Sequence, residues 1–277
     1  MKEPESLEET QRRLAGVGSM PDEPETTAPT PRGRFGVLVG VAAVLALGGV
    51  GVAVALLVAS PAPDWTAYPG SDFRTVDEVL AADSLETIAA ESDAFTEEYK
   101  NALTDEFGIT WTERTPPAVN PDVNGYGGDS MLYSYSGGEW QGAVTMDDPA
   151  ARERIYDLFE QLAYAHLATD VFTWNDYTSV GKVDQYGAAE KADQVVWELI
   201  GSGSDTHPVR FTSVLYDRSL PADPTFGGTT WIRIEEGDTN TFFVYLFAHS
   251  YALLAEADRE AFIEAVEPYA GHTPPGQ

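Results

Sequence analysis

The sequence predicts an α+β protein, with a single transmembrane helix followed by an extracytoplasmic domain of antiparallel three-stranded sheets packed with helices. Three observations support this prediction. One long stretch, 36–59, contains no charged residue and no Asn, Gln or Pro. After it, runs with helical periodicity alternate with strand-like runs. Hydrophobic residues make up 43% of the chain, which is ordinary for a globular protein and sufficient for a buried core.

The apolar stretch 36–59 is long enough to cross a membrane as a helix. At ~1.5 Å per residue it spans ~36 Å, against a hydrocarbon core of ~30 Å. The hydrophobic part of a cleaved signal peptide runs for only ~7–15 residues and ends at a small-residue cleavage site. Pro61, just after the stretch, is poorly suited to such a site. The sequence therefore predicts an uncleaved, single-pass anchor in the plasma membrane.

The flanks of this stretch predict its orientation. Arg32 and Arg34 precede it, whereas Arg74 is the one basic residue among the first twenty positions after it, against four acidic ones. Basic flanks stay on the cytoplasmic side of a membrane, so we expect a cytoplasmic tail, 1–35, and an extracytoplasmic domain. The tail is polar and rich in Pro, which predicts disorder.

Gly36 and Gly40 lie four residues apart in the predicted span. Small residues at this spacing let two transmembrane helices approach closely, so the pair favours a homodimer formed through the span. Gly and Ala are also frequent in bacterial membrane helices generally, and this alternative stays open.

The charge of the chain is strongly negative. Lys and Arg number 16 against 45 Asp and Glu, and after the apolar stretch 11 basic residues face 38 acidic ones. Such a surface repels nucleic acid and attracts cations or basic partners; alternatively, the acidity serves solubility. The absence of Cys excludes disulfides, thiolate metal sites and cysteine nucleophiles. The bias toward Ala, Asp, Glu, Gly and Arg over Lys is typical of a GC-rich bacterial genome.

We expect a spacer with a short helix over 60–82 and the folded domain over 83–277. Helices are predicted from N-cap signals and helical spacing at 84–107, from 148 onward, and at 188–200 and 256–266. Strands are predicted from apolar runs between turn residues at 109–114, 130–136, 140–146, 209–217, 230–235 and 241–249. Gly137 and Gly138 predict a hairpin between the second and third of these strands.

The predicted order of helix, three strands and helix occurs twice, in possible repeat units 84–168 and 188–270. Arg152 and Glu153 of the first unit align with Arg259 and Glu260 of the second. The two units are either a duplication or two amphipathic helices with acidic caps that align by chance. A three-stranded sheet with one helix layer has a small core, so we expect the units to pack together in one domain.

Asp122, Asn124 and Asp129 make the loop after Pro121 rich in side-chain oxygens. Extracellular calcium sites use such ligands, so the three residues are a candidate metal site. Their spacing does not match an EF-hand, and the Asn-Gly and Gly-Gly pairs of this loop are also ordinary turn formers. No cofactor-binding signature accompanies them.

Trp174, Asn175 and Tyr177 combine aromatic and amide side chains, a pattern typical of loops that bind a peptide or a glycan. Aromatic residues that anchor a long connection onto a core give the same pattern. The sequence contains no HExxH, GxSxG or SxxK motif and no phosphate-binding loop with Lys. His166 and His249 border apolar faces, where a structural role is the ordinary one.

These observations predict a membrane-anchored bacterial envelope protein whose acidic domain binds a protein, a peptide or a cation outside the cell. The alternatives are an envelope enzyme of unrecognised type and an assembly partner that acts through its transmembrane helix. Convergence of His166, His249 and carboxylates in one cleft would favour the enzyme. An exposed groove lined by Trp174, Tyr177 or Trp111 without titratable partners would favour recognition.

Overall fold

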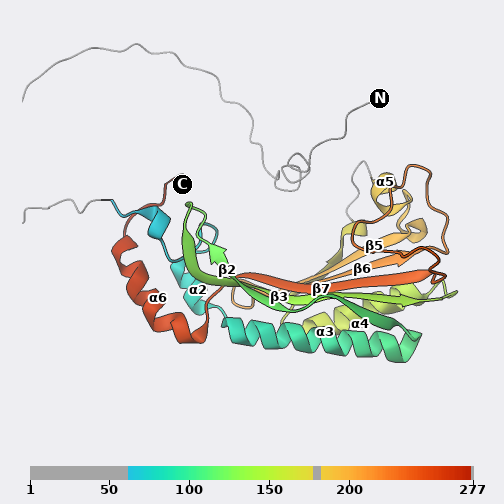
Figure 1. Ribbon diagram of the computed structural model, residues 1–277, viewed down its shortest axis with the longest axis horizontal. Coiled ribbons are helices and arrows are strands. Elements are labelled where there is room, and N and C mark those ends of the chain that lie inside the picture. The colour runs from blue at the N-terminus through green and yellow to red at the C-terminus, as the bar shows by residue number, and fades with distance from the viewer. Residues whose placement is uncertain (1–61, 177–181, 276–277) are drawn as a thin grey trace, which may run out of the picture. The chain divides into compact units, whose positions relative to one another are not determined.

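A seven-stranded antiparallel sheet organises residues 62–176 and 182–275, which the computed structural model describes (Figure 1). All of these residues belong to the second of two compact units, Ala59–Gln277. The strands follow the spatial order β1-β3-β7-β6-β5-β4, and β2 pairs with the first part of β3. They are β1 (Thr110–Thr115), β2 (Ala118–Val123), β3 (Asp129–Val144), β4 (Asp170–Thr173), β5 (Val196–Ser202), β6 (Arg210–Asp217) and β7 (Phe242–Leu253). The α+β class predicted from the sequence is confirmed.

Helices cover one face of this sheet and leave much of the other face without a helical layer. The α-helices are α2 (Val76–Ala81), α3 (Leu85–Phe107), α4 (Ala151–Ala165), α5 (Lys182–Tyr186) and α6 (Arg259–Val266). Short 3-10 turns are η1 (Trp65–Ala67), η2 (Trp174–Asp176), η3 (Lys191–Asp193), η4 (Glu256–Asp258) and η5 (Glu267–Tyr269). In Figure 1 the sheet is curved, with α3 and α4 on its convex side. Helices α2 and α6 lie at one end and α5 at the other.

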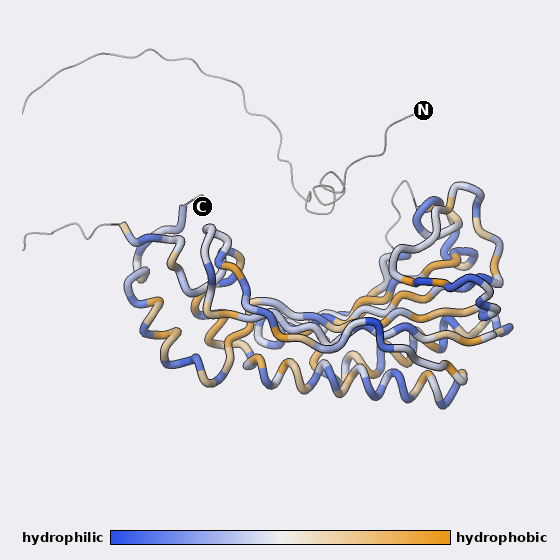
Figure 2. Tube along the Cα trace, viewed as in Figure 1, coloured by the Kyte–Doolittle hydropathy of each residue, from blue (hydrophilic) through white to orange (hydrophobic). Residues whose placement is uncertain are grey.

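Local signals in the sequence explain the bounds of α3. The Ser84 hydroxyl accepts a hydrogen bond from the Thr87 N–H, and Gly108 ends the helix with φ of 71°, a conformation that favours glycine. Hydrophobic and hydrophilic residues alternate along the helix (Figure 2), so one side faces the sheet. The helix predicted over 84–107 is confirmed.

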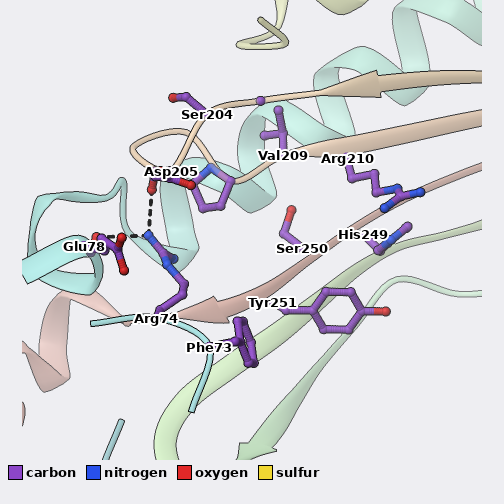
Figure 3. A pocket seen from close by; sticks show the side chains of 12 residues that line it. Phe73, Arg74, Glu78, Ser204, Asp205, Val209, Arg210, His249, Ser250 and Tyr251 are labelled. Carbon is purple, nitrogen blue, oxygen red and sulfur yellow. Dashed lines mark hydrogen bonds between the residues drawn. The ribbon is translucent and has the colours of Figure 1, made fainter. Parts of the chain in front are cut away.

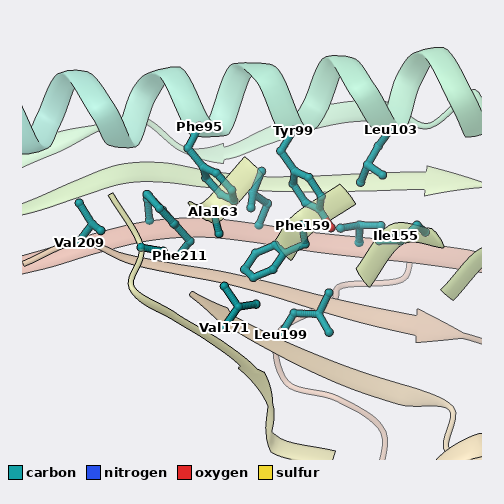
Figure 4. Packing of buried hydrophobic residues seen from close by; sticks show 14 of the residues in the cluster. Phe95, Tyr99, Leu103, Ile155, Phe159, Ala163, Val171, Leu199, Val209 and Phe211 are labelled. Atoms are coloured by element: carbon teal, nitrogen blue, oxygen red, sulfur yellow. The ribbon is translucent and has the colours of Figure 1, made fainter. Parts of the chain in front are cut away.

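The main core lies between α3, α4 and the sheet (Figure 4). Phe95 of α3 is fully buried, and its ring stacks on Phe211 of β6 with centroids 3.9 Å apart. Phe159 of α4 meets Phe95 edge to face at 5.6 Å. The hydroxyl of Tyr99 lies 3.1 Å from the Ser213 Oγ, which satisfies both buried groups.

The predicted hairpin at Gly137 and Gly138 is wrong, because β3 continues through both residues. The pairing of β3 with β7 shifts between Ser136 and Glu139, and Gly138 has φ of 81°. The two glycines thus form a β-bulge. The long apolar strand β7 pairs with β3 on both sides of the bulge, and this long-range pairing overrides the local turn signal.

Two further predictions in the second half are wrong. The segment predicted as a helix over 188–200 instead contains β5, which is paired on both sides by β4 and β6. A buried central strand is apolar on both faces, so its pattern resembles that of a buried helix. Residues 230–235 form no strand but belong to the connection between β6 and β7. The two predicted three-stranded sheets are one continuous sheet. The order of a helix, three strands and a helix does occur twice, as α3-β1-β2-β3-α4 and, after β4, as α5-β5-β6-β7-α6, and the duplication stays a prediction.

Candidate functional site

Strand β7 presents a row of aromatic side chains to the face of the sheet opposite α3 and α4. Residues on the helix side belong to the main core: Phe242, Val244, Leu246 and Ala248. Residues on the other side are Phe243, Tyr245, Phe247, His249 and Tyr251. Such alternation is the expected geometry of a strand. The connection 218–241 covers the first part of this row, where Ile232 packs with Phe243 and Tyr245.

Beyond this connection the sheet face is open and hollowed. The hollow has a volume of about 630 Å³, and we call it the trough. It is lined from β2, β3, β5, β6 and β7 and from Trp231 of the connection. Cross-strand pairing places Ser136 beside His249, and Thr212 beside Phe247, on its floor.

Aromatic rings form one wall and part of the floor of the trough. Trp231 stacks on Phe247 with centroids 5.7 Å apart and an interplanar angle of 21°. The Phe247 ring stacks in turn on His249 at 5.3 Å, and His249 meets Tyr251 at 5.3 Å. Trp231 is 46% exposed and Tyr251 is 55% exposed. Large aromatic faces are therefore open to a ligand in the trough.

The trough also contains charged groups that differ in how they are paired. Glu139 accepts a hydrogen bond from the Thr115 hydroxyl at 2.9 Å, and Glu198 accepts one from the Tyr186 hydroxyl at 3.2 Å. The guanidinium of Arg210, in contrast, makes no hydrogen bond or ion pair with any residue that the structure describes. The carboxylates already hold donors, whereas a cationic donor group remains available.

Burial perturbs two titratable groups of the trough in opposite directions. It raises the pKa of Glu198, although the Tyr186 hydrogen bond and the charge of Arg210 act against it. Burial, together with the positive charge of Arg210, lowers the pKa of His249 to about 4. Near neutral pH the imidazole of His249 is therefore uncharged.

A second hollow of about 320 Å³ adjoins the trough and shares Arg210, His249 and Tyr251 with it. We call it the Arg74 cavity, because Arg74 lines the side of the hollow opposite Arg210 (Figure 3). The N–H groups of Arg74 donate to the backbone oxygens of Ala252, Glu78 and Asp205 at 3.1, 3.0 and 2.6 Å. This arginine joins three segments that are far apart in the sequence.

Two of the three candidate metal residues, Asn124 and Asp122, are held by other contacts, and Asp129 is exposed. The Asn124 amide nitrogen donates to the backbone oxygens of Thr66 and Tyr68 at 3.0 and 2.9 Å, and its oxygen accepts from the N–H groups of Tyr126 and Gly128. Asp122 accepts from the Ala252 N–H at 2.9 Å. Both ends of the Asn124 amide are therefore hydrogen-bonded to backbone groups, which gives this residue a structural role. Within 62–176 and 182–275, no three His, Asp or Glu side chains are grouped closely enough to hold a metal ion.

Of the candidate recognition residues, Trp174 and Asn175 do not line the trough. Asn175 is buried, and its amide bonds to Gln194, Val196, Glu198 and Thr173. Trp174 is 39% exposed and contacts Phe172 edge to face at 5.4 Å. Tyr177 lies outside the described residues. Asn175 therefore anchors the connection after β4, which was the alternative interpretation.

Gly36, Gly40 and the rest of the predicted transmembrane span also lie outside the described residues. Among the residues that the structure does describe, no helix combines the length and apolar character needed to cross a membrane.

The two histidines considered from the sequence have different surroundings. His166 is buried on the helix side, where its Nδ1 lies 3.0 Å from Glu91 and its Nε2 3.4 Å from Glu98. His249 lies in the trough together with Glu139 and Glu198. The alternation of residues along β7 indicates the face on which His249 lies, but no sequence pattern indicates that Arg210 and Trp231 line the same hollow.

No protein-family model, curated protein or solved structure matches the chain.

Proposed function

We propose that this protein is a membrane-anchored, extracytoplasmic binding protein that holds a small amphipathic ligand in the trough. The open face of the sheet carries the proposal. Part of that face is covered by the connection 218–241, as is usual for an apolar sheet face. The open part combines exposed aromatic rings with polar groups that lack partners among the described residues, in a hollow of about 630 Å³. Small-molecule sites have this size and composition.

The membrane anchor in this proposal is the apolar stretch 36–59. Its length, the preceding Arg32 and Arg34, and the acidic residues after it support a single span with the domain outside the cell. The Gly36 and Gly40 spacing supports pairing of two such spans. A binding domain displayed in this way would capture its ligand in the envelope of a bacterial cell.

The ligand class differs from the cation or peptide expected from the overall acidity of the chain. The carboxylates of Glu139 and Glu198 are already hydrogen-bonded, and the unpaired charge in the trough is the positive one of Arg210. The trough thus offers a cationic donor without a hydrogen-bond partner among the described residues, beside carboxylates that already accept hydrogen bonds. Complementarity in the trough, rather than net charge, would determine what binds there.

A soluble aromatic probe tests the proposal in the full-length protein in a nonionic detergent. We expect 2-naphthyl phosphate to bind, with heat measured by titration calorimetry against a detergent blank. Trp231→Ala should weaken binding ~5- to 10-fold, because one aromatic contact contributes ~1 kcal/mol. Tyr164→Ala, which removes a 49% exposed aromatic side chain from α4, is the matched control and should not change the affinity. Equal affinity of the wild-type and Trp231→Ala proteins would refute binding in the trough.

One observation favours an acid–base enzyme as a second candidate. Glu198 and His249 lie in the same trough with pKa values shifted in opposite directions, as happens in many active sites. Against it, the Nδ1 of His249 has no hydrogen-bond partner among the described residues, so no nucleophile is paired with this base. Release of fluorescent 2-naphthol from 2-naphthyl phosphate, abolished by His249→Ala, would favour the enzyme.

A further inference from the structure

The Arg74 cavity brings two guanidinium groups to one hollow. Arg74 and Arg210 both line it, on either side of Ser250 (Figure 3). The hydrogen bonds of the Arg74 guanidinium go to neutral backbone carbonyls, and neither arginine has a carboxylate within ion-pair distance among the described residues. The negative charges of Glu78 and Asp205 act on Arg74, and that of Glu198 on Arg210, only from beyond ion-pair distance. This is unusual in a chain with 45 acidic residues and 16 basic ones.

Two further polar atoms of this cavity lack partners. Ser250 is only 2% exposed, and its hydroxyl makes no hydrogen bond with the described residues. Figure 3 shows this hydroxyl directed toward the segment that carries Asp205 and Val209, in the space between Arg74 and Arg210. The Nδ1 of His249 is likewise buried and unpaired. Buried polar atoms without partners are rare, and each one calls for an explanation.

Two carboxylates also line the Arg74 cavity, and they make a cation the competing occupant. Glu78 is exposed and bonds to the Thr75 N–H in the cap of α2 at 2.7 Å. Asp205 is exposed at the rim. A cation in the cavity would be repelled by the two guanidinium groups. An anion would accept hydrogen bonds from these groups and from the Ser250 hydroxyl. Ser250 is buried and Arg74 is half-buried, whereas Arg210, Glu78 and Asp205 are exposed. Solvent screening weakens the charges of the three exposed groups, so the half-buried Arg74 and the buried hydroxyl of Ser250 favour an anion.

We infer that the Arg74 cavity binds the anionic head of the trough ligand, a carboxylate or a phosphate, between Arg74, Arg210 and Ser250. This inference rests on the proposed function, because it assigns one end of the same ligand. The apolar body of the ligand lies in the trough against Trp231 and Phe247. Arginine forms its strongest hydrogen bonds with such oxyanions, and the Ser250 hydroxyl gains the acceptor that it lacks.

A matched pair of probes tests the charge requirement in the full-length protein in nonionic detergent. The pair is 2-naphthyl phosphate and 2-naphthol, which share the ring system and differ in the anion; 2-naphthoate serves as the carboxylate arm. We expect the wild-type protein to bind at least one of the two anions ~10-fold or more tightly than 2-naphthol. Arg210→Gln should remove this preference, and the control Arg233→Gln should retain it. The Arg233 side chain makes no hydrogen bond or ion pair with the described residues and lies outside both hollows.

The outcomes separate this inference from the proposed function. Equal affinity for 2-naphthol and both anions, or a preference that Arg210→Gln leaves intact, would overturn the anion site. If 2-naphthol binding is still weakened by Trp231→Ala in that case, the trough remains a binding site. Ser250→Ala provides a second readout: weaker binding of the anions with unchanged binding of 2-naphthol supports the inference, and unchanged binding of all three contradicts the role of the hydroxyl.

Discussion

Two buried serines on neighbouring strands should respond in opposite ways to the same substitution. Ser250 is 2% exposed and its hydroxyl has no partner, whereas Ser213 is fully buried and its hydroxyl bonds to Tyr99 at 3.1 Å. An unpaired buried polar group costs ~1–3 kcal/mol. Ser250→Ala removes this cost and should raise the free energy of unfolding by ~1 kcal/mol after the loss of a few packing contacts. Ser213→Ala leaves the buried Tyr99 hydroxyl without a hydrogen-bond partner and should lower the free energy of unfolding by ~1–3 kcal/mol.

Thermal unfolding of the full-length protein measures this contrast. For a folded part of this size, 1 kcal/mol corresponds to ~2–4 °C in Tm. The expected result is therefore a Tm a few degrees higher for Ser250→Ala and several degrees lower for Ser213→Ala, without added ligand. A fall in Tm for Ser250→Ala comparable to that of Ser213→Ala would show that the Ser250 hydroxyl has a partner. The Arg74 cavity would then contain no buried hydroxyl free to donate to an anion.

Three further predictions test other parts of the structure. Asn124→Asp replaces the amide nitrogen with oxygen facing backbone carbonyls, so it should lower the Tm, and added Ca²⁺ should not restore it; a Ca²⁺-dependent rise would instead support a metal site. Arg210→Gln should raise the pKa of His249 above about 4 while burial, the larger cause, keeps it below 6.5, as NMR titration of the imidazole will show; an unchanged pKa would contradict their proximity. The low pKa of His249 also means that unfolding takes up a proton between pH 6.5 and 4, so its contribution to stability is lost as the pH falls through this range. Phe95→Ala should lower the free energy of unfolding by ~3–5 kcal/mol in denaturant titration, and a loss below ~1 kcal/mol would contradict its stacking on Phe211.

Elements with strong local signals could be predicted from the sequence, and elements that depend on distant partners could not. The helix α3 has its own cap, periodicity and terminal glycine, and its bounds follow from them. The bulge at Gly138 and the strand β5 depend on pairing with β7 and on burial between β4 and β6. Neither the pairing with β7 nor the burial between β4 and β6 can be recognised from the few residues that surround the bulge or the strand.

The candidate site could be predicted only in part from the sequence, for the same reason. The alternation along β7 placed His249 on a face with Phe243, Tyr245 and Phe247, and the structure confirms that arrangement. Which part of this face stays open depends on where the connection 218–241 lies, and its strand-like pattern gave the wrong element. Asn124 and Asn175 stood out as candidate site residues, but both are buried amides that bind backbone groups. A polar residue in a loop gives the same pattern whether it binds a ligand or the chain itself.

The most direct test of the trough as a binding site is native mass spectrometry of the full-length protein released from the membranes of its own host. Wild-type protein should carry a small acidic molecule, detected as a discrete added mass. Arg210→Gln and Trp231→Ala should lose this mass, and Tyr164→Ala should retain it. Wild-type protein without any bound molecule, or an added mass that both trough variants retain, would contradict the proposal that the open face of the sheet binds the ligand.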